Sequence, residues 1–150
     1  MMGWLLDTNV VAELFLARPE KRVTAWAAAQ PSNRVFISVL TLAEMERGIE
    51  ALPLPDPRRR EYGRMLERVE LKFLGRVRGV EDAIVRRWAR MRGQAYRHFK
   101  RSPAPIDALI AATAIEHDLY LVTRNVRDMQ LTGARVFDPW RDDAALFPLK

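Results

Sequence analysis

The 150-residue sequence contains no cysteine. This absence excludes a disulfide framework, a zinc finger, an iron–sulfur site and a thiol nucleophile, and it suits a reducing compartment. Only two histidines are present, His98 and His117, and we interpret them as a surface residue and a packing residue rather than an acid–base pair. A glycine-rich, phosphate-cradling loop with its lysine is also missing, which argues against an NTPase.

Long apolar runs are missing too. Asp7 and Glu13 interrupt the apolar N-terminus too early for a signal peptide, and no run approaches the roughly 18 apolar residues that a membrane span needs. We therefore expect a cytoplasmic protein without membrane contact. Apolar residues make up 49% of the sequence, enough to bury a core, and the length predicts a single domain over residues 1–150.

Positive charge is concentrated in the middle of the chain. Residues 58–101 carry 15 basic and 5 acidic side chains (+10), whereas the rest of the chain carries 10 basic and 14 acidic ones (−4). A basic segment beside acidic flanks is typical of an enzyme that attracts a polyanion and cuts it elsewhere. On charge alone, solvated faces of arginine-rich helices are an equally good interpretation.

Short apolar stretches alternate with helical patterns along the chain. Strands are predicted at residues 3–6, 35–37, 120–122 and 135–137. Helices are predicted near residues 10–16, 19–30, 41–50, 62–73, 84–95 and 106–116, with a short turn or helix near 126–129. This alternation predicts a parallel sheet covered by helices on both faces, with functional residues at the carboxyl ends of the strands.

Asp7 and Glu44 are the first two candidate functional acids. Asp7 ends a buried strand, where it could also cap the helix that follows. Glu44 points away from the apolar face of its helix, as an ordinary solvent-facing glutamate would. One turn further, Gly48 costs up to about 1 kcal/mol relative to alanine inside a helix. A close approach of another backbone or of a ligand would explain that glycine.

Asp107 and Asp128 are the other two candidates. If Pro105 is the first residue of its helix, Asp107 falls in the first turn, where a negative charge also favours the helix dipole. Because that helix is largely apolar, we expect Asp107 to face a cavity. Asp128 follows the strand at 120–122, where a surface acid paired with Arg124 or Arg127 would be ordinary.

Taken together, the four carboxylates predict a metal site. Carboxylates brought to one sheet edge repel each other unless a cation neutralises them. Ligand sets made only of oxygen favour hard divalent ions, Mg²⁺ or Mn²⁺, over zinc. Such an ion polarises a phosphate and lowers the pKa of a bound water, which then attacks phosphorus. The residues by themselves therefore favour a metal-dependent nuclease.

Five motifs, in order along the chain, carry a resemblance to a known family. They are LLDTN at 5–9, SVLTLAE at 38–44 followed by Gly48, PIDALIAATA at 105–114, LVTRNVRD at 121–128 and VFDPW at 136–140. The chain resembles PIN-domain ribonucleases and, more closely, the VapC toxins of toxin–antitoxin pairs, in their FitB-like branch. The resemblance spans nearly the whole chain, and the ordered combination is much more specific than any single motif.

The resemblance implies a PIN-like three-layer α/β/α sandwich with a central parallel sheet of four to five strands. It implies an Mg²⁺-dependent endoribonuclease in which Mn²⁺ can substitute. Asp7, Glu44 and Asp107 fall on the family's catalytic, metal-binding acids, and Thr8 falls on a supporting hydroxyl.

The fourth acidic position departs from the family pattern. Where many members carry an acid soon after the threonine of the strand, this chain has Asn125, and Asp128 comes three residues later. We assign Asp128 as the fourth catalytic and metal-binding acid and Asn125 as a neutral supporting partner.

The resemblance also implies partners. They are an RNA substrate, a second copy of the chain in a homodimer, and a cognate VapB-like antitoxin whose C-terminal segment covers the active site. Promoter DNA would be bound only through the antitoxin complex. A basic arm would hold the RNA backbone; its members are Arg86, Arg87, Arg90, Lys100 and Arg101.

Two other functions compete with this interpretation. A PIN-like module that binds nucleic acid or a partner without cutting would bind RNA in a salt-sensitive way that ignores metal. A module that had lost its activity should have lost some of these acids, whereas Asp7, Glu44 and Asp107 all stand at the family's positions. An Mg²⁺-dependent phosphatase on a different doubly wound fold would need a second aspartate two residues after Asp7, where Asn9 stands.

Overall fold

Five parallel strands form the sheet of the computed structural model, which describes residues 1–150. The strands are β1 (Gly3–Leu6), β2 (Val35–Ser38), β3 (Val77–Arg78), β4 (Leu119–Val122) and β5 (Val136–Phe137). All neighbours pair in parallel, in the order β3-β2-β1-β4-β5. The predicted parallel sheet of four to five strands is confirmed.

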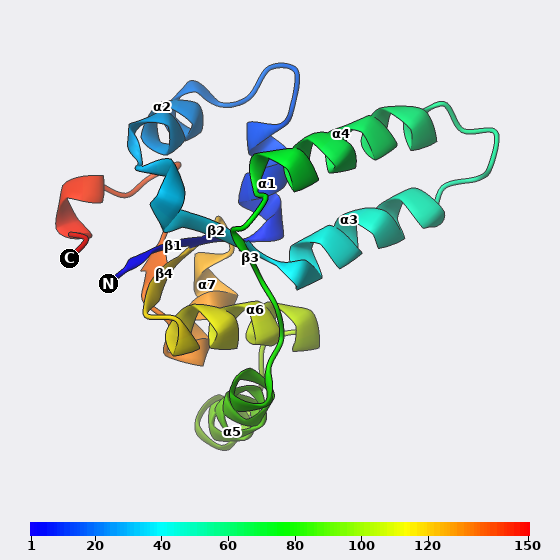
Figure 1. Cartoon of the computed structure of the whole chain (residues 1–150). Helices are drawn as coiled ribbons and strands as arrows, with labels where there is room; N and C mark the ends of the chain where they lie inside the picture. The colour runs from blue at the N-terminus through cyan, green and yellow to red at the C-terminus, as the bar shows by residue number, and fades with distance from the viewer.

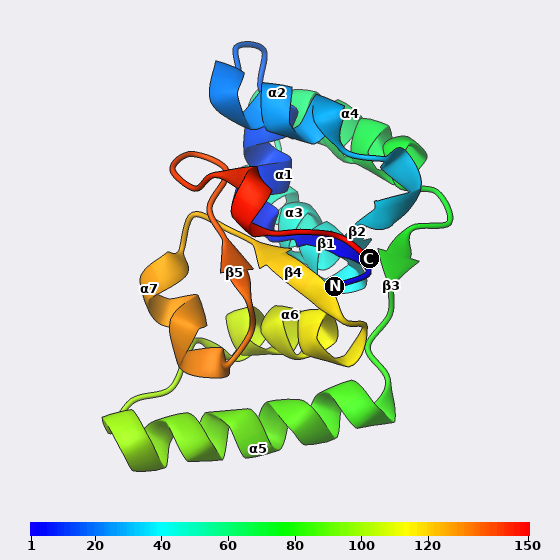
Figure 2. The ribbon, with the colours of Figure 1, turned by 90° about the vertical axis from the view of Figure 1, so that its left-hand side faces the viewer.

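Helices cover both faces of this sheet. They are α1 (Thr8–Leu14), α2 (Lys21–Ala29), α3 (Val39–Glu50), α4 (Arg58–Lys72), α5 (Asp82–Phe99), α6 (Pro105–Glu116) and α7 (Val126–Met129). Figure 2 shows α1 and α2 over one face and α6 under the other, with α5 lying outside α6. The predicted α/β/α layering is confirmed, with α5 added beyond the third layer. None of the helices combines the length and apolar character that crossing a bilayer requires.

The strand β1 shows why both faces must be covered. Trp4 and Leu6 pack into the core on one face, and Leu5 packs into the core on the other, because successive side chains of a strand point to opposite faces. All three are buried. On the first face, Trp4 contacts the rings of Tyr120 and Phe137 at centroid distances of 5.0 and 5.1 Å. A parallel strand between two helical layers is therefore apolar throughout.

The short strand β3 is the element that the sequence does not predict. Val77 and Arg78 lie between two amphipathic helices, and two residues carry no readable alternation. They become a strand because Val77 pairs with Ile37 and Arg78 with Ser38 of β2. The Arg78 guanidinium also lies over the Phe36 ring, 4.3 Å from its centroid. Pairing with an existing strand, not local propensity, creates β3.

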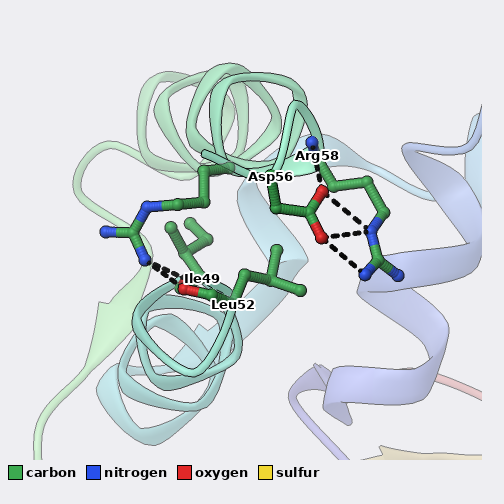
Figure 3. A network of polar contacts seen from close by, with 5 residues as sticks. Ile49, Leu52, Asp56 and Arg58 are labelled. Atoms are coloured by element: carbon green, nitrogen blue, oxygen red, sulfur yellow. Dashed lines mark hydrogen bonds and ion pairs between the residues drawn. The ribbon is translucent and has the colours of Figure 1, made fainter. Parts of the chain in front are cut away.

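The helices α3 and α4 form a hairpin that projects from the sheet (Figure 1). Arg59, in the first turn of α4, donates from Nη1 to the carbonyl oxygens of Ile49 and Leu52, both at 2.8 Å (Figure 3). Asp56, just before α4, forms an ion pair with Arg58, the first residue of the helix, at 2.7 Å. Carbonyl groups at the end of a helix have few intrahelical donors. Arg59 adds a charged donor to Ile49, near the end of α3, and to Leu52, just beyond it, and so fixes α4 beside α3.

Candidate active site

The carboxyl ends of β1 and β4 bring two polar side chains together. Leu6 at the end of β1 is in register with Val122 at the end of β4, so the next residues of the two strands, Asp7 and Thr123, lie side by side. Thr123 Oγ1 donates to Asp7 Oδ2 at 2.7 Å. This is the sheet edge at which parallel α/β folds gather functional residues.

Asp7 is 4% exposed and accepts three hydrogen bonds. Its Oδ1 accepts from the Thr8 backbone N–H at 2.8 Å, and its Oδ2 accepts from Thr123 Oγ1 at 2.7 Å and from Asn9 Nδ2 at 3.2 Å. Asp7 is the N-cap of α1, so the capping interpretation is correct. A carboxylate offers about four acceptor lone pairs, however, so Asp7 caps its helix and still retains a place for a further ligand.

Thr123 and Asn9 support Asp7, a role that their sequence motifs alone do not reveal. Besides donating to Asp7, Thr123 Oγ1 accepts from Asn9 Nδ2 at 3.1 Å and from the Asn125 backbone N–H at 3.0 Å. Asn9 Oδ1 accepts from the Arg124 backbone N–H at 3.2 Å. The available signal was positional, because Thr123 directly follows a buried strand and Asn9 lies two residues beyond Asp7.

Glu44 on α3 is half-buried and held by Thr8. Thr8 Oγ1 donates to Glu44 Oε1 at 2.7 Å and lies 3.1 Å from Thr41 Oγ1. The interpretation of Glu44 as an ordinary solvent-facing glutamate is therefore wrong. No other backbone lies close to Gly48, since a Cβ added there would meet nothing within 4 Å.

Asp107 is half-buried in the first turn of α6, which begins at Pro105 as predicted. Burial raises the pKa of Asp107, and the nearby charges of Glu44 and Asp128 raise it further. These electrostatic neighbours come from α3 and α7, so three helices bring carboxylates toward the same place.

Asp128 on α7 is about half exposed, with 48% of its side chain accessible, and it forms an ion pair with Arg101 at 3.4 Å. The ordinary pairing with Arg124 or Arg127 does not form. Asn125 is the N-cap residue of α7, but its side chain makes no capping hydrogen bond. The side chain of Asn125 is therefore available to a ligand.

The four acids at this edge, Asp7, Glu44, Asp107 and Asp128, are called the acid edge below. Burial raises the pKa of Asp7 to about 6; the hydrogen bonds from Thr123 and Thr8 lower it, and the charges of Asp107 and Glu44 raise it. Neither Asp7, Glu44 nor Asp107 forms an ion pair with a basic side chain. Negative charge without a basic partner favours the binding of a cation.

No three His, Cys, Asp or Glu side chains are grouped closely enough to hold a metal ion as they stand. Repulsion between carboxylates opposes a tighter grouping in the absence of a cation. The donor set nevertheless fits a hard divalent ion, because it offers only oxygen atoms. Asp7, Glu44 and Asp107 are the side chains of the acid edge that could hold such an ion without first breaking an ion pair.

The basic arm is largely paired within the chain. Three of its members form ion pairs, which are Arg86–Asp82, Arg87–Glu116 and Arg101–Asp128. Arg90 and Lys100 are exposed and form none. Exposed ion pairs contribute little free energy, so the paired arginines can still exchange their partners for phosphates.

Comparison with known proteins identifies the family. Residues 4–132 match the PIN domain. The chain belongs to the PIN domain family. This PIN-domain chain is 32% identical over 138 residues to Toxin FitB of Neisseria gonorrhoeae, covering 92% of the chain and 99% of that protein. It is 33% identical over 139 residues to VapC ribonuclease Y4jK of Sinorhizobium fredii, covering 91% and 96% respectively.

A solved structure supports the same assignment. The structure of FitAB bound to an IR36 DNA fragment aligns with a TM-score of 0.82 and 31% sequence identity, covering 93% of this chain and 97% of that one. The predicted resemblance to the FitB-like branch of the VapC toxins is thereby confirmed, and so is the PIN-like fold.

Proposed function

We propose that this PIN-domain chain is a divalent-metal-dependent endoribonuclease and the toxin of a toxin–antitoxin pair. The observation that carries the proposal is the acid edge, where the buried Asp7 lies near Glu44 and Asp107 with no basic side chain to neutralise them. Relatives named as a toxin and as a ribonuclease, each aligned over more than nine tenths of the chain, support it.

Asp7, Glu44 and Asp107 are the proposed ligands of the ion, Mg²⁺ with Mn²⁺ able to substitute. Asp128 is the proposed fourth acid, and Asn125 is its neutral neighbour at the start of α7. When bound, the ion supplies a water of lowered pKa and polarises the phosphate to be cut. The acids themselves hold the ion and set the place at which the RNA is cut.

The neighbouring hydroxyl and amide groups position these acids. Thr123 and Asn9 fix the orientation of Asp7, and Thr8 fixes that of Glu44. Side chains that hydrogen-bond to metal ligands typically change metal affinity or activity by about 10- to 100-fold when they are removed. We therefore include all three as positioning residues.

The proposed partners are RNA, a VapB-like antitoxin and a second copy of the chain. Similar chains have been solved as FitAB bound to DNA and as DNA-bound VapBC from Salmonella typhimurium, which supports an antitoxin as partner and promoter DNA as a ligand of the complex. The basic arm from Arg86 to Arg101 is proposed to contact the RNA backbone.

A module that binds RNA without cutting it is the second candidate. It is favoured by the absence of a ready group of three metal-binding side chains. Such a module would bind RNA in a salt-sensitive way whether or not a divalent ion is present.

The deciding experiment incubates the purified chain, freed from any antitoxin, with labelled RNA in the presence of Mg²⁺, Mn²⁺ or a chelator. We expect cleavage with either metal, none with the chelator, and none by the variants Asp7→Asn and Asp107→Asn. Retained cleavage and growth arrest in both variants would show that the acid edge is not the active site. RNA that is bound but left intact by the unaltered chain with both metals would establish the non-cutting module.

A further inference from the structure

A concave pocket lies beside the acid edge, between the segments that follow β4 and β5. It encloses about 410 Å³. The residues that line it are Arg124, Val126, Arg127, Gln130, Asp138 and Arg141. We call it the arginine pocket, because half of its lining residues are arginines brought together from two separate segments.

The charge of the arginine pocket is not balanced within the chain. Arg124, Arg127 and Arg141 form no ion pair. The one acid of the lining, Asp138, is 4% exposed, and its Oδ1 accepts from the Trp140 backbone N–H at 2.9 Å. Three guanidinium groups around one cavity repel each other unless an anion lies between them. The pocket therefore favours a negatively charged ligand.

The side chain of Arg124 and the backbone of Arg141 are held in place before any ligand arrives. The Arg124 guanidinium lies over the Trp140 ring, 5.0 Å from its centroid, and its backbone N–H donates to Asn9 Oδ1 at 3.2 Å. The Arg141 carbonyl accepts from Arg22 Nη2 at 2.9 Å, which ties the segment after β5 to α2. A planar guanidinium can donate two parallel hydrogen bonds to two oxygen atoms of a phosphate. When its position is already fixed, the side chain loses less conformational entropy on binding.

The arginine pocket is adjacent to the acid edge. Arg124 directly follows Thr123, whose hydroxyl binds Asp7, and Arg127 directly precedes Asp128. A nucleic-acid strand with one phosphate at the acid edge can therefore place another phosphate of the same strand in the pocket. An acidic peptide would lack this reason to span both places.

We propose that Arg124, Arg127 and Arg141 form a binding subsite for a backbone phosphate of the RNA substrate. The inference rests on the proposed ribonuclease function. It adds on which side of the acid edge the RNA is bound. The basic arm approaches the acid edge through Arg101, which follows α5 and pairs with Asp128, whereas the arginine pocket lies between the segments that follow β4 and β5. The two surfaces place the acid edge between two sets of phosphate contacts.

The test measures binding of a labelled single-stranded RNA at several salt concentrations, with Asp7→Asn present in every protein so that cleavage does not interfere. The double variant Arg127→Gln/Arg141→Gln removes two proposed phosphate contacts. We expect about tenfold weaker binding at moderate salt, and a slope of log affinity against log salt that is smaller by about 0.7, the contribution of one phosphate of a single strand. If the double variant does not fold, each single variant is expected to lower the slope by less than about 0.7 and to weaken RNA binding at moderate salt.

The matched control is Arg18→Gln/Arg135→Gln, which also removes two exposed arginines without ion pairs. Arg135 precedes β5 and Arg141 follows it, so they lie at opposite edges of the sheet. We expect this control to change RNA affinity by less than about twofold and to leave the salt slope unchanged.

The outcomes separate the pocket from its alternatives. If the pocket variant and the control lose RNA affinity equally, the subsite is overturned, and the loss reflects only the overall charge of the protein. Unchanged RNA binding together with weaker antitoxin binding would also overturn it and assign the pocket to a protein partner. Cleavage by the chain with Asp7 intact is measured in parallel: if RNA is not cut but the pocket variant alone loses RNA binding, the nuclease proposal fails while the subsite stands.

Discussion

The acid edge and the basic middle of the chain, residues 58–101, differ in whether their charged side chains have partners of opposite charge. At the acid edge, Asp7, Glu44 and Asp107 lie near one another without a basic partner. Burial raises the pKa of Asp7 and Asp107, and the charges of the neighbouring acids raise it further. In residues 58–101, by contrast, five of the fifteen basic side chains already form ion pairs. The arginines that form ion pairs there are Arg58, Arg59, Arg86, Arg87 and Arg101.

Several arginines of the basic middle serve the fold. Arg59 satisfies carbonyl groups at the end of α3, and Arg76 Nη1 donates to the carbonyl oxygens of Ser32 and Val35, both at 2.7 Å. A guanidinium group suits this task because its donors point in fixed directions. Charge counted along the sequence therefore overstates the charge available to a ligand. Function is better sought where charged side chains lack partners, as at the acid edge and in the arginine pocket.

The sharpest test of this comparison uses two glutamates of α3. Glu44→Gln removes a charge of the acid edge but keeps the acceptor for Thr8, whereas Glu46→Gln removes an exposed charge that forms no ion pair. Glu44 is a proposed metal ligand, and loss of a ligand costs more than loss of a group that supports it, so we expect RNA cleavage to fall at least about 100-fold for Glu44→Gln. For Glu46→Gln we expect a change of less than about twofold. Equal cleavage rates would contradict the assignment of Glu44.

The next largest effect concerns pH and metal. The pKa of Asp7 is raised from 3.8 to about 6 in the folded chain, so the folded state binds more protons than the unfolded state between these values, and stability falls as pH rises. The free energy of unfolding of the metal-free chain should drop by about 2 kcal/mol from pH 4 to pH 7. Urea unfolding at several pH values measures this drop.

Two controls accompany the pH experiment. Asp7→Asn should remove most of the decline, and Mg²⁺ should restore stability at pH 7 in the unaltered chain but not in this variant. An identical pH dependence in both proteins would show that Asp7 is not the group responsible.

Loss of the Thr123 hydroxyl should have a smaller effect. Thr123→Val deprives Asp7 of a hydrogen bond, leaves the Asn125 backbone N–H without its acceptor and removes one of the two acceptors of Asn9 Nδ2. We expect cleavage to fall by about 10- to 100-fold and the free energy of unfolding by about 1–3 kcal/mol. Thr123→Ser should restore both quantities. Rescue of stability without rescue of cleavage would separate folding from the positioning of Asp7.

The smallest predicted effect lies in the basic middle. Arg59→Ala should lower the free energy of unfolding by about 1–2 kcal/mol, because the carbonyl groups of Ile49 and Leu52 lose a charged donor. Arg58→Ala, which removes an exposed ion pair with Asp56, should lower it by less. Chemical denaturation of the two variants measures the difference. The reverse order would show that the hairpin is not held by the carbonyl contacts.

Local patterns in the sequence were enough for most of the fold. Apolar stretches that end at Asp7 and before Thr123 gave β1 and β4, and Pro105 marked the start of α6. Such signals lie within a few neighbouring residues, because side-chain periodicity and capping act over one or two turns. The positions of the four candidate acids could be predicted for the same reason, since each lies at the end of a strand or within a predicted helix.

Only the tertiary structure decided which groups meet. It paired Asp128 with Arg101 instead of Arg124 or Arg127, and it made a strand of Val77 and Arg78 by placing them beside β2. It also gave Thr123 its place against Asp7 and gathered the arginine pocket from two segments. These contacts join residues that are far apart in the sequence, and their distances follow from how strands and helices pack, which no local pattern records.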